Sequence, residues 1–126
     1  MERVLFITHR GKRVLFIDHT GSTPQEMLRT MDGVERIIAA EPHDSLLTLS
    51  DFTGAEFDKT TADRMKVVAA KDRPYVHRAA VVGADSIPEV YFRNLESFSA
   101  RHFPKFKTRE EALDWLTSEG TEAASS

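Results

Sequence analysis

Apolar and polar residues form blocks along the chain, and the first two apolar blocks predict a pair of strands. Residues 4–7 and 14–17 are uninterrupted apolar runs within two copies of the sequence Arg-Val-Leu-Phe-Ile. Residues 9–12 join them, so the pattern predicts a β-hairpin in which Gly11 takes a positive φ. Four consecutive apolar residues indicate burial on both faces, at least for the second strand.

A helix is predicted after this hairpin. Thr23 can cap it, Glu26 completes a capping box, and Pro42 requires the helix to end earlier. Helical spacing gives its buried stripe as Met27, Met31, Val34 and Ile38.

Two more strands surround a second helix. Residues 45–50 and 75–82 are predicted strands, and residues 51–54 are a predicted loop. Several residues between 58 and 61 can cap the helix between them, whose apolar positions are Ala62, Met65, Val68 and Ala69.

The third helix is predicted to start at a cap on Asp85 or Ser86, with Pro88 in its first turn. Phe92 lies off the apolar stripe and is predicted to be at least partly exposed. The stripe consists of Ile87, Val90, Tyr91, Leu95 and Phe98.

A short strand and a fourth helix complete the pattern. Residues 103–106 predict an edge strand, because Pro104 has no N–H to donate to a neighbour. Thr108 and Glu111 predict a second capping box, which opens a helix with Ala112, Leu113, Trp115 and Leu116. The order β-β-α-β-α-β-α-β-α predicts a single α/β domain over residues 1–119, with a mixed, mostly parallel five-stranded sheet, an N-terminal antiparallel hairpin and four helices. Residues 120–126 are predicted to be a flexible tail.

Composition excludes several classes of function. The 126 residues have a net charge of −3, so the basic excess typical of a nucleic-acid binder is missing. The sequence has no cysteine, which excludes disulfides and thiolate zinc sites. The five histidines lack ligand spacing, and we expect neither a metal nor a cofactor. No apolar run approaches the length of a membrane span, and the start of the chain does not resemble a signal peptide, so a cytoplasmic location is expected.

Three loops should meet at the carboxyl ends of the parallel strands, where open α/β sheets bind ligands. They cover residues 18–21, 51–54 and 83–85, and each contains Gly and Asp. Turn formation explains the same residue types, and it is the alternative to a binding or partner surface. We would test His19 first, because the charge of a histidine changes near neutral pH. The candidate residues are His19, Thr20, Asp51, Phe52, Thr53, Gly54, Gly83 and Asp85.

Three segments resemble the SpoIIAA-like proteins, small bacterial proteins with a fold similar to STAS domains. They are Leu-Leu-Thr-Leu-Ser-Asp-Phe-Thr-Gly at 46–54, Arg-Pro-Tyr-Val at 73–76 leading into Ala-Val-Val-Gly at 80–83, and Phe-Lys-Thr-Arg-Glu-Glu-Ala-Leu-Asp-Trp-Leu at 106–116. The resemblance covers residues 2–117. It implies a fold and no activity, because most members have no assigned biochemistry.

The resemblance also suggests where a phosphorylation switch would lie. Related anti-sigma-factor antagonists are phosphorylated on a serine at the start of the helix after the third strand. That turn corresponds to residues 58–61, where Lys59 replaces the serine. Thr60 and Thr61 are therefore the candidate phosphorylation sites, and the alternative is that one of them only caps the helix.

Two functional hypotheses follow. The first is a non-enzymatic regulatory or protein-interaction module, which binds a protein partner or a second copy through residues 51–66. The alternative is a small-ligand or lipid-binding protein with transient membrane association, in which the helix at 86–99 moves away and opens an apolar cleft near His19 and Phe52. An enzyme is the third possibility, and the sequence shows no catalytic motif for it.

Overall fold

The computed structural model describes residues 3–118 and has the predicted order of elements. Its strands and helices are β1 (Val4–His9), β2 (Lys12–Asp18), α1 (Pro24–Ala39), β3 (Leu46–Asp51), α2 (Lys59–Asp72), β4 (Val76–Val82), the 3-10 turn η1 (Ala84–Ser86), α3 (Glu89–Ser99), β5 (Lys105–Phe106) and α4 (Arg109–Leu116). The strands form one sheet in the order β1-β2-β3-β4-β5. The β1–β2 pair is antiparallel and the other pairs are parallel, as predicted.

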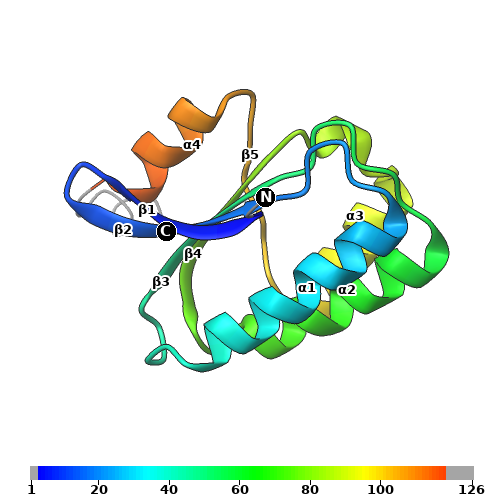
Figure 1. Cartoon of the computed structure of the whole chain (residues 1–126), viewed down its shortest axis with the longest axis horizontal. Helices are drawn as coiled ribbons and strands as arrows, with labels where there is room; N and C mark the ends of the chain where they lie inside the picture. The colour runs from blue at the N-terminus through cyan, green and yellow to red at the C-terminus, as the bar shows by residue number, and fades with distance from the viewer. Residues whose placement is uncertain (1–2, 119–126) are drawn as a thin grey trace.

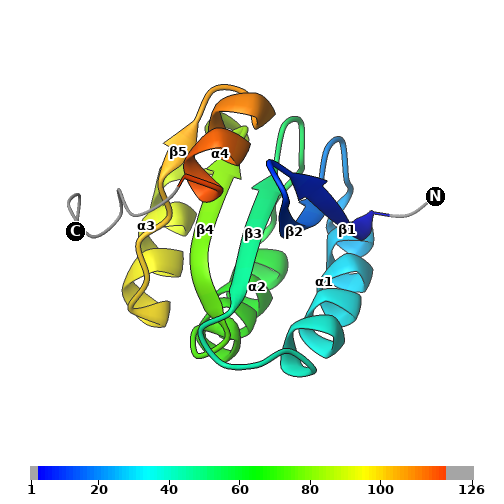
Figure 2. The ribbon, with the colours of Figure 1, turned by 90° about the vertical axis from the view of Figure 1, so that its left-hand side faces the viewer.

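Helices cover the two faces of the sheet unequally. Figure 1 shows α1, α2 and α3 together on one face and α4 alone on the other. Figure 2 shows the sheet from the side of α4, with β5 at the edge opposite β1. The largest buried cluster lies between α1, α2, α3 and the sheet, and a second cluster lies under α4. This three-layer arrangement is typical of α/β domains.

The hairpin forms as its sequence predicts. Arg10 and Gly11 have φ values of 52° and 78°, so the two turn residues are left-handed, as a tight hairpin turn requires. Val14 and Leu15 in β2 are fully buried, whereas Leu5 in β1 is partly exposed. Burial on both faces is therefore confirmed for the second strand.

Capping follows the sequence fully at α1 and in part at α4. Thr23 and Glu26 form the complete reciprocal capping box of α1. Thr108 accepts a hydrogen bond from the Glu111 N–H at the start of α4, but among the described residues the Glu111 side chain does not accept the return bond that a complete box requires.

The residue that caps α2 is neither Thr60 nor Thr61. Asp58 is the N-cap, and its carboxylate accepts a hydrogen bond from the Thr61 N–H at 2.8 Å. The alternative that Thr60 or Thr61 caps the helix is therefore wrong. A carboxylate suits this position because it also interacts favourably with the helix dipole.

The predicted face of α3 is correct in part. Ile87 and Leu95 of the predicted stripe are buried. Phe92 is 5% exposed, however, whereas Val90 and Phe98, predicted to be buried, are 51% and 55% exposed. The short helix has apolar residues on more than one face, and its packing against α2 selects the face that contains Phe92.

The start of α3 also lies later than predicted. Residues 84–86 form the separate turn η1, and Pro88 takes the N-cap position in place of Asp85 or Ser86. The Ser86 hydroxyl instead accepts a hydrogen bond from the Gly54 N–H at 2.8 Å. The hydroxyl therefore joins two loops and caps no helix.

Two further predictions concern the ends of the chain and membranes. The predicted tail at 120–126 and the last residue of the predicted domain lie outside the described residues. Within residues 3–118, none of the helices combines the length and the apolar character needed to cross a membrane.

Candidate functional site

The loops after β2 and β3 contain the same four-residue turn twice. Asp18 Oδ1 accepts hydrogen bonds from the Thr20 N–H at 3.0 Å and the Thr20 hydroxyl at 2.6 Å. Asp51 Oδ1 accepts the equivalent bonds from Thr53 at 2.9 and 2.7 Å. A glycine with positive φ, at position 21 or 54, follows each threonine. The repeated sequence Asp-x-Thr-Gly therefore encodes two matching turns on neighbouring parallel strands.

These two loops lie against each other, as the sequence predicts. The His19 N–H donates to the Asp51 carbonyl at 2.8 Å, and the Gly21 N–H donates to the Thr53 carbonyl at 2.9 Å. The His19 and Phe52 rings stack with centroids 4.9 Å apart. Asp51, placed in a loop by the sequence, is the buried last residue of β3.

The third loop closes over the second. Gly83 has a φ of 73°, and a Cβ built on it would lie 2.4 Å from the Thr53 nitrogen. No side chain larger than hydrogen fits here without movement of the backbone. Asp85 is exposed on η1. All eight candidate residues thus lie at or just after the carboxyl ends of β2, β3 and β4, although their side chains do not share one surface.

Arg109, which is not among the site residues predicted from the sequence, joins the loops from the other face of the sheet. Its Nε donates to Asp51 Oδ2 at 2.6 Å, and its Nη2 lies 3.8 Å from Asp18 Oδ1. Its guanidinium also lies 4.6 Å from the centre of the Phe16 ring. A cation in the first turn of a helix interacts unfavourably with the helix dipole. An arginine at the first position of α4 is therefore the sequence signal that could have indicated an anionic partner for Arg109.

The carboxylates of these loops are engaged in structural contacts. Burial raises the pKa of Asp18, but the Thr20 hydrogen bonds and the charges of Arg109 and Arg3 outweigh it, so the pKa is lowered. Asp51 is paired with Arg109 and Thr53. Within residues 3–118, no group of three or more His, Asp or Glu side chains has a metal-binding arrangement.

His19 behaves differently from the expectation that its charge changes near neutral pH. Its ring is 3% exposed, and burial, helped by Arg3, lowers its pKa to about 4. The side chain is therefore neutral at pH 7. Its Nδ1 atom is buried and has no hydrogen-bond partner among the described residues.

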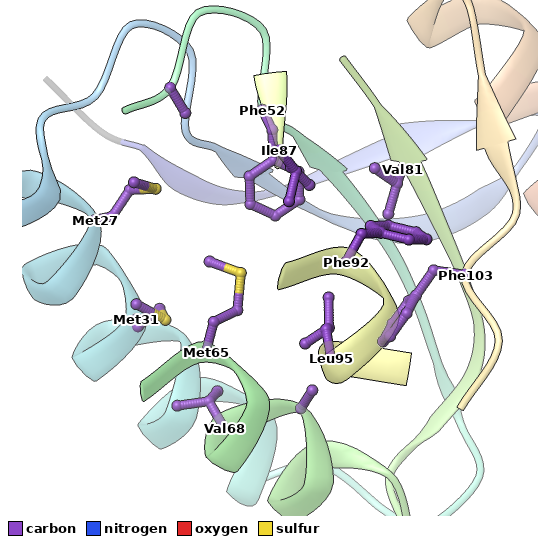
Figure 3. Close-up of a cluster of buried hydrophobic side chains, with 12 residues drawn as sticks. Met27, Met31, Phe52, Met65, Val68, Val81, Ile87, Phe92, Leu95 and Phe103 are labelled. Atoms are coloured by element: carbon purple, nitrogen blue, oxygen red, sulfur yellow. The ribbon is translucent and has the colours of Figure 1, made fainter. Parts of the chain in front are cut away.

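His19 lines a partly open cavity of about 80 Å³ between the sheet and the layer formed by α1, α2 and α3. One water molecule needs about 10–15 Å³ by this measure, so the cavity exceeds the space for a single water. Figure 3 shows Met27 and Met31 of α1 and Met65 of α2 pointing into this core, with Phe52 above Met65 in the view. The apolar lining includes Met31, Phe52, Met65, Val68, Leu95 and Phe103.

Two charged residues also line the cavity. Asp72 is the last residue of α2 and is 8% exposed, and Arg101 follows α3 and is half-buried. No sequence pattern predicts that these two residues share a cavity, because they are distant in the chain and belong to different segments.

The two threonines at the start of α2 differ in accessibility. Thr60 is exposed, whereas Thr61 is fully buried and its hydroxyl has no partner among the described residues. Phosphorylation of either remains a prediction, and in this structure only Thr60 is accessible to a kinase.

The comparisons with known proteins concern the fold. The chain is similar to the crystal structure of an uncharacterised DUF3478-family protein with a SpoIIAA-like fold from Shewanella loihica PV-4. The TM-score is 0.69, and the match covers 90% of this chain and 91% of that chain at 20% sequence identity. The chain has a SpoIIAA-like fold. No protein-family model and no curated protein matches its sequence.

The SpoIIAA-like fold confirms the resemblance seen in the sequence, including the mixed sheet, the N-terminal hairpin and the four helices. Identity of this level shows the fold alone. A specific role for the chain must therefore be argued from its own cavity and surface.

Proposed function

We propose that this protein binds one small apolar molecule in the cavity between the sheet and α1, α2 and α3. The observation that supports it is the cavity itself, which is lined mainly by apolar side chains of the buried core. A bound apolar molecule removes this apolar lining from water and thereby stabilises the folded protein.

The lining suits such a ligand. Met31 and Met65 face the cavity from two different helices, and methionine side chains adapt to ligands of different shape. In this proposal α3 moves when a ligand enters. Gly83 before α3 and Ala100 after it both have positive φ, so the helix lies between two abrupt changes of chain direction.

Two alanine variants of α2 test this proposal. Ala69 lines the cavity, whereas its neighbour Ala70 does not. Ala69→Leu should fill the space and abolish binding of 1-octanol, measured by calorimetry. Ala70→Leu makes the same chemical change on the same helix and should bind as the wild type does. Equal binding by both variants, or no binding by the wild type, contradicts the proposal.

A regulatory or protein-interaction role is the second candidate, supported by the exposed surface of α2 and α3. Lys59 and Thr60 are exposed at the start of α2, and Phe98 of α3 is exposed beside Lys66, whose Nζ lies 5.1 Å from the ring centre. Val90 and Phe98 could also contact a membrane surface transiently. The exposed Leu5 on edge strand β1 offers a surface for a homodimer.

Mass spectrometry separates the second candidate from the first. A mass excess equal to a phosphoryl group that survives denaturation and disappears in Thr60→Ala supports a switch at this surface. Lys59→Glu should then reduce capture of the partner while leaving thermal stability unchanged. An excess that disappears on denaturation supports the bound ligand instead, and the native spectrum gives the oligomeric state.

A further inference from the structure

Asp72 is a buried carboxyl group in the wall of the cavity. Among the described residues its carboxylate makes no hydrogen bond or ion pair, although the residue is only 8% exposed. Burial raises its pKa to about 7, opposed by the charge of Arg101 and assisted by that of Glu35. Asp72 therefore changes its charge near neutral pH inside a mainly apolar space.

The charged groups around Asp72 come from three segments. From α1, Glu35 is already held by Arg64 at 2.7 Å and by Lys71 at 3.1 Å. From the segment after α3, Arg101 faces the cavity. Burial and, to a smaller extent, the charge of Arg73 lower the pKa of Arg101 to about 10, although the charge of Asp72 opposes them. The residues of β4 that line the cavity are apolar.

Arg101 has hydrogen-bond donors to spare. Its Nη1 donates to the Ala69 carbonyl at 3.1 Å, and its guanidinium lies 4.6 Å from the centre of the Phe103 ring. Within residues 3–118, no group accepts from its Nε or Nη2. A planar guanidinium with free donors is suited to a carboxylate or a similar anion.

We propose that the ligand of this cavity is an apolar molecule with one anionic group, that Arg101 binds the anion, and that Asp72 takes up a proton when the ligand binds. This inference rests on the proposed function, because it specifies which apolar molecules the cavity accepts. The buried Nδ1 of His19 provides a further polar contact in the same cavity.

Anion binding and protonation of Asp72 are linked because both change the charge next to Arg101. When Asp72 is ionised, its negative charge interacts with Arg101 and repels a second anion in the same space. When Asp72 is protonated, the positive charge of Arg101 has no negative charge beside it in the cavity, and the ligand anion supplies one. Anion binding therefore favours the protonated aspartic acid, and the affinity falls as the pH rises.

Octanoate and 1-octanol are a matched pair of probes for this inference. Octanoate stays ionised between pH 6 and pH 8, so any pH dependence in this range comes from the protein. With one proton taken up near pH 7, we expect octanoate to bind about tenfold more weakly at pH 8 than at pH 6. The affinity of 1-octanol should stay constant over the same range.

Two variants assign the effect to named residues. Asp72→Asn should bind octanoate with no pH dependence, at the affinity of the wild type at pH 6. Arg101→Gln should lose octanoate binding and keep 1-octanol binding, whereas Arg93→Gln, on the exposed surface of α3, should change neither. If Asp72→Asn does not fold, the pH dependence of octanoate binding to the wild type and the loss of octanoate binding in Arg101→Gln still test the proposal.

The outcomes separate the two proposals. If octanoate and 1-octanol bind with the same affinity at every pH, the anionic ligand is excluded while the apolar cavity function stands. If neither probe binds, the proposed function fails, and this inference fails with it.

Discussion

Arg109 Nε donates a 2.6 Å hydrogen bond to Asp51 Oδ2 and thereby connects the two sides of the sheet. Asp51 ends β3 among the loops at its carboxyl edge, whereas Arg109 begins α4. The Asp51 side chain is 5% exposed, so this contact neutralises a buried carboxylate. Arg109 thus has a structural role in holding α4 against the loops.

Removal of this contact should destabilise the protein. Arg109→Met leaves the Asp51 carboxylate without its cation, and we expect a loss of about 2 kcal/mol in the free energy of unfolding, measured in urea. The control is Arg93→Met, which removes an exposed pair with Glu89 and should cost less than about 0.5 kcal/mol. Equal losses in the two variants would contradict the structural role of Arg109.

Gly83 should be the least replaceable glycine of the described glycines. Its added Cβ would lie 2.4 Å from the Thr53 nitrogen and 2.7 Å from the Thr53 Cα, both in backbone. Gly11 also has positive φ, but nothing lies within 4 Å of an added Cβ there. We expect Gly83→Ala to cost well above 2 kcal/mol and Gly11→Ala about 1 kcal/mol, the strain of the left-handed backbone alone. Similar unfolding midpoints for the two variants would show that the loops are not closely packed.

His19 should make the protein sensitive to acid. Its pKa is about 4 in the folded protein and 6.5 for the free side chain, so the unfolded chain binds more protons between these values. Stability from neutral His19 is complete above pH 6.5 and decreases as the pH falls through this window, by up to about 1.4 kcal/mol per pH unit.

His19→Phe keeps an aromatic ring against Phe52 and removes the titration. The variant should lose less stability than the wild type between pH 7 and pH 5 in urea unfolding. Asp72 titrates in both proteins, so its contribution cancels in the comparison. Parallel pH profiles for wild type and variant would contradict the burial of a neutral His19.

Phe92 and Phe98 form a matched pair on α3. Phe92 is buried and Phe98 is 55% exposed, although the sequence predicts the reverse. Phe92→Ala should cost about 3–5 kcal/mol, and Phe98→Ala less than about 1 kcal/mol, in the free energy of unfolding. A larger loss for Phe98→Ala would restore the orientation that the sequence predicts.

The elements predicted correctly depend on local chemistry. The hairpin follows from Gly11 between two apolar runs, and the start of α1 follows from the reciprocal bonds of Thr23 and Glu26. The order of strands and helices then determines the parallel sheet and the meeting of the three loops, because carboxyl ends of parallel strands share one edge.

The elements predicted wrongly depend on contacts between distant residues. α3 packs against α2, and the Lys105 Nζ lies 4.4 Å from the centre of the buried Phe92 ring, so the contacts of this helix are with segments that its own sequence pattern does not describe. The cavity arises because side chains from several helices and strands do not fill the space between them, which no local pattern records. The pairing of Arg109 with Asp51 joins residues 58 positions apart.

The most direct test of ligand binding uses the methyl groups of the methionines. The chain has four, at positions 1, 27, 31 and 65. Met31 and Met65 line the cavity, whereas Met27 lies in the same buried cluster without lining it. In an NMR titration of methyl-labelled protein with 1-octanol, the signals of Met31 and Met65 should shift most. Unchanged methionine signals, or equal shifts at Met27, Met31 and Met65, would contradict a ligand site in this cavity.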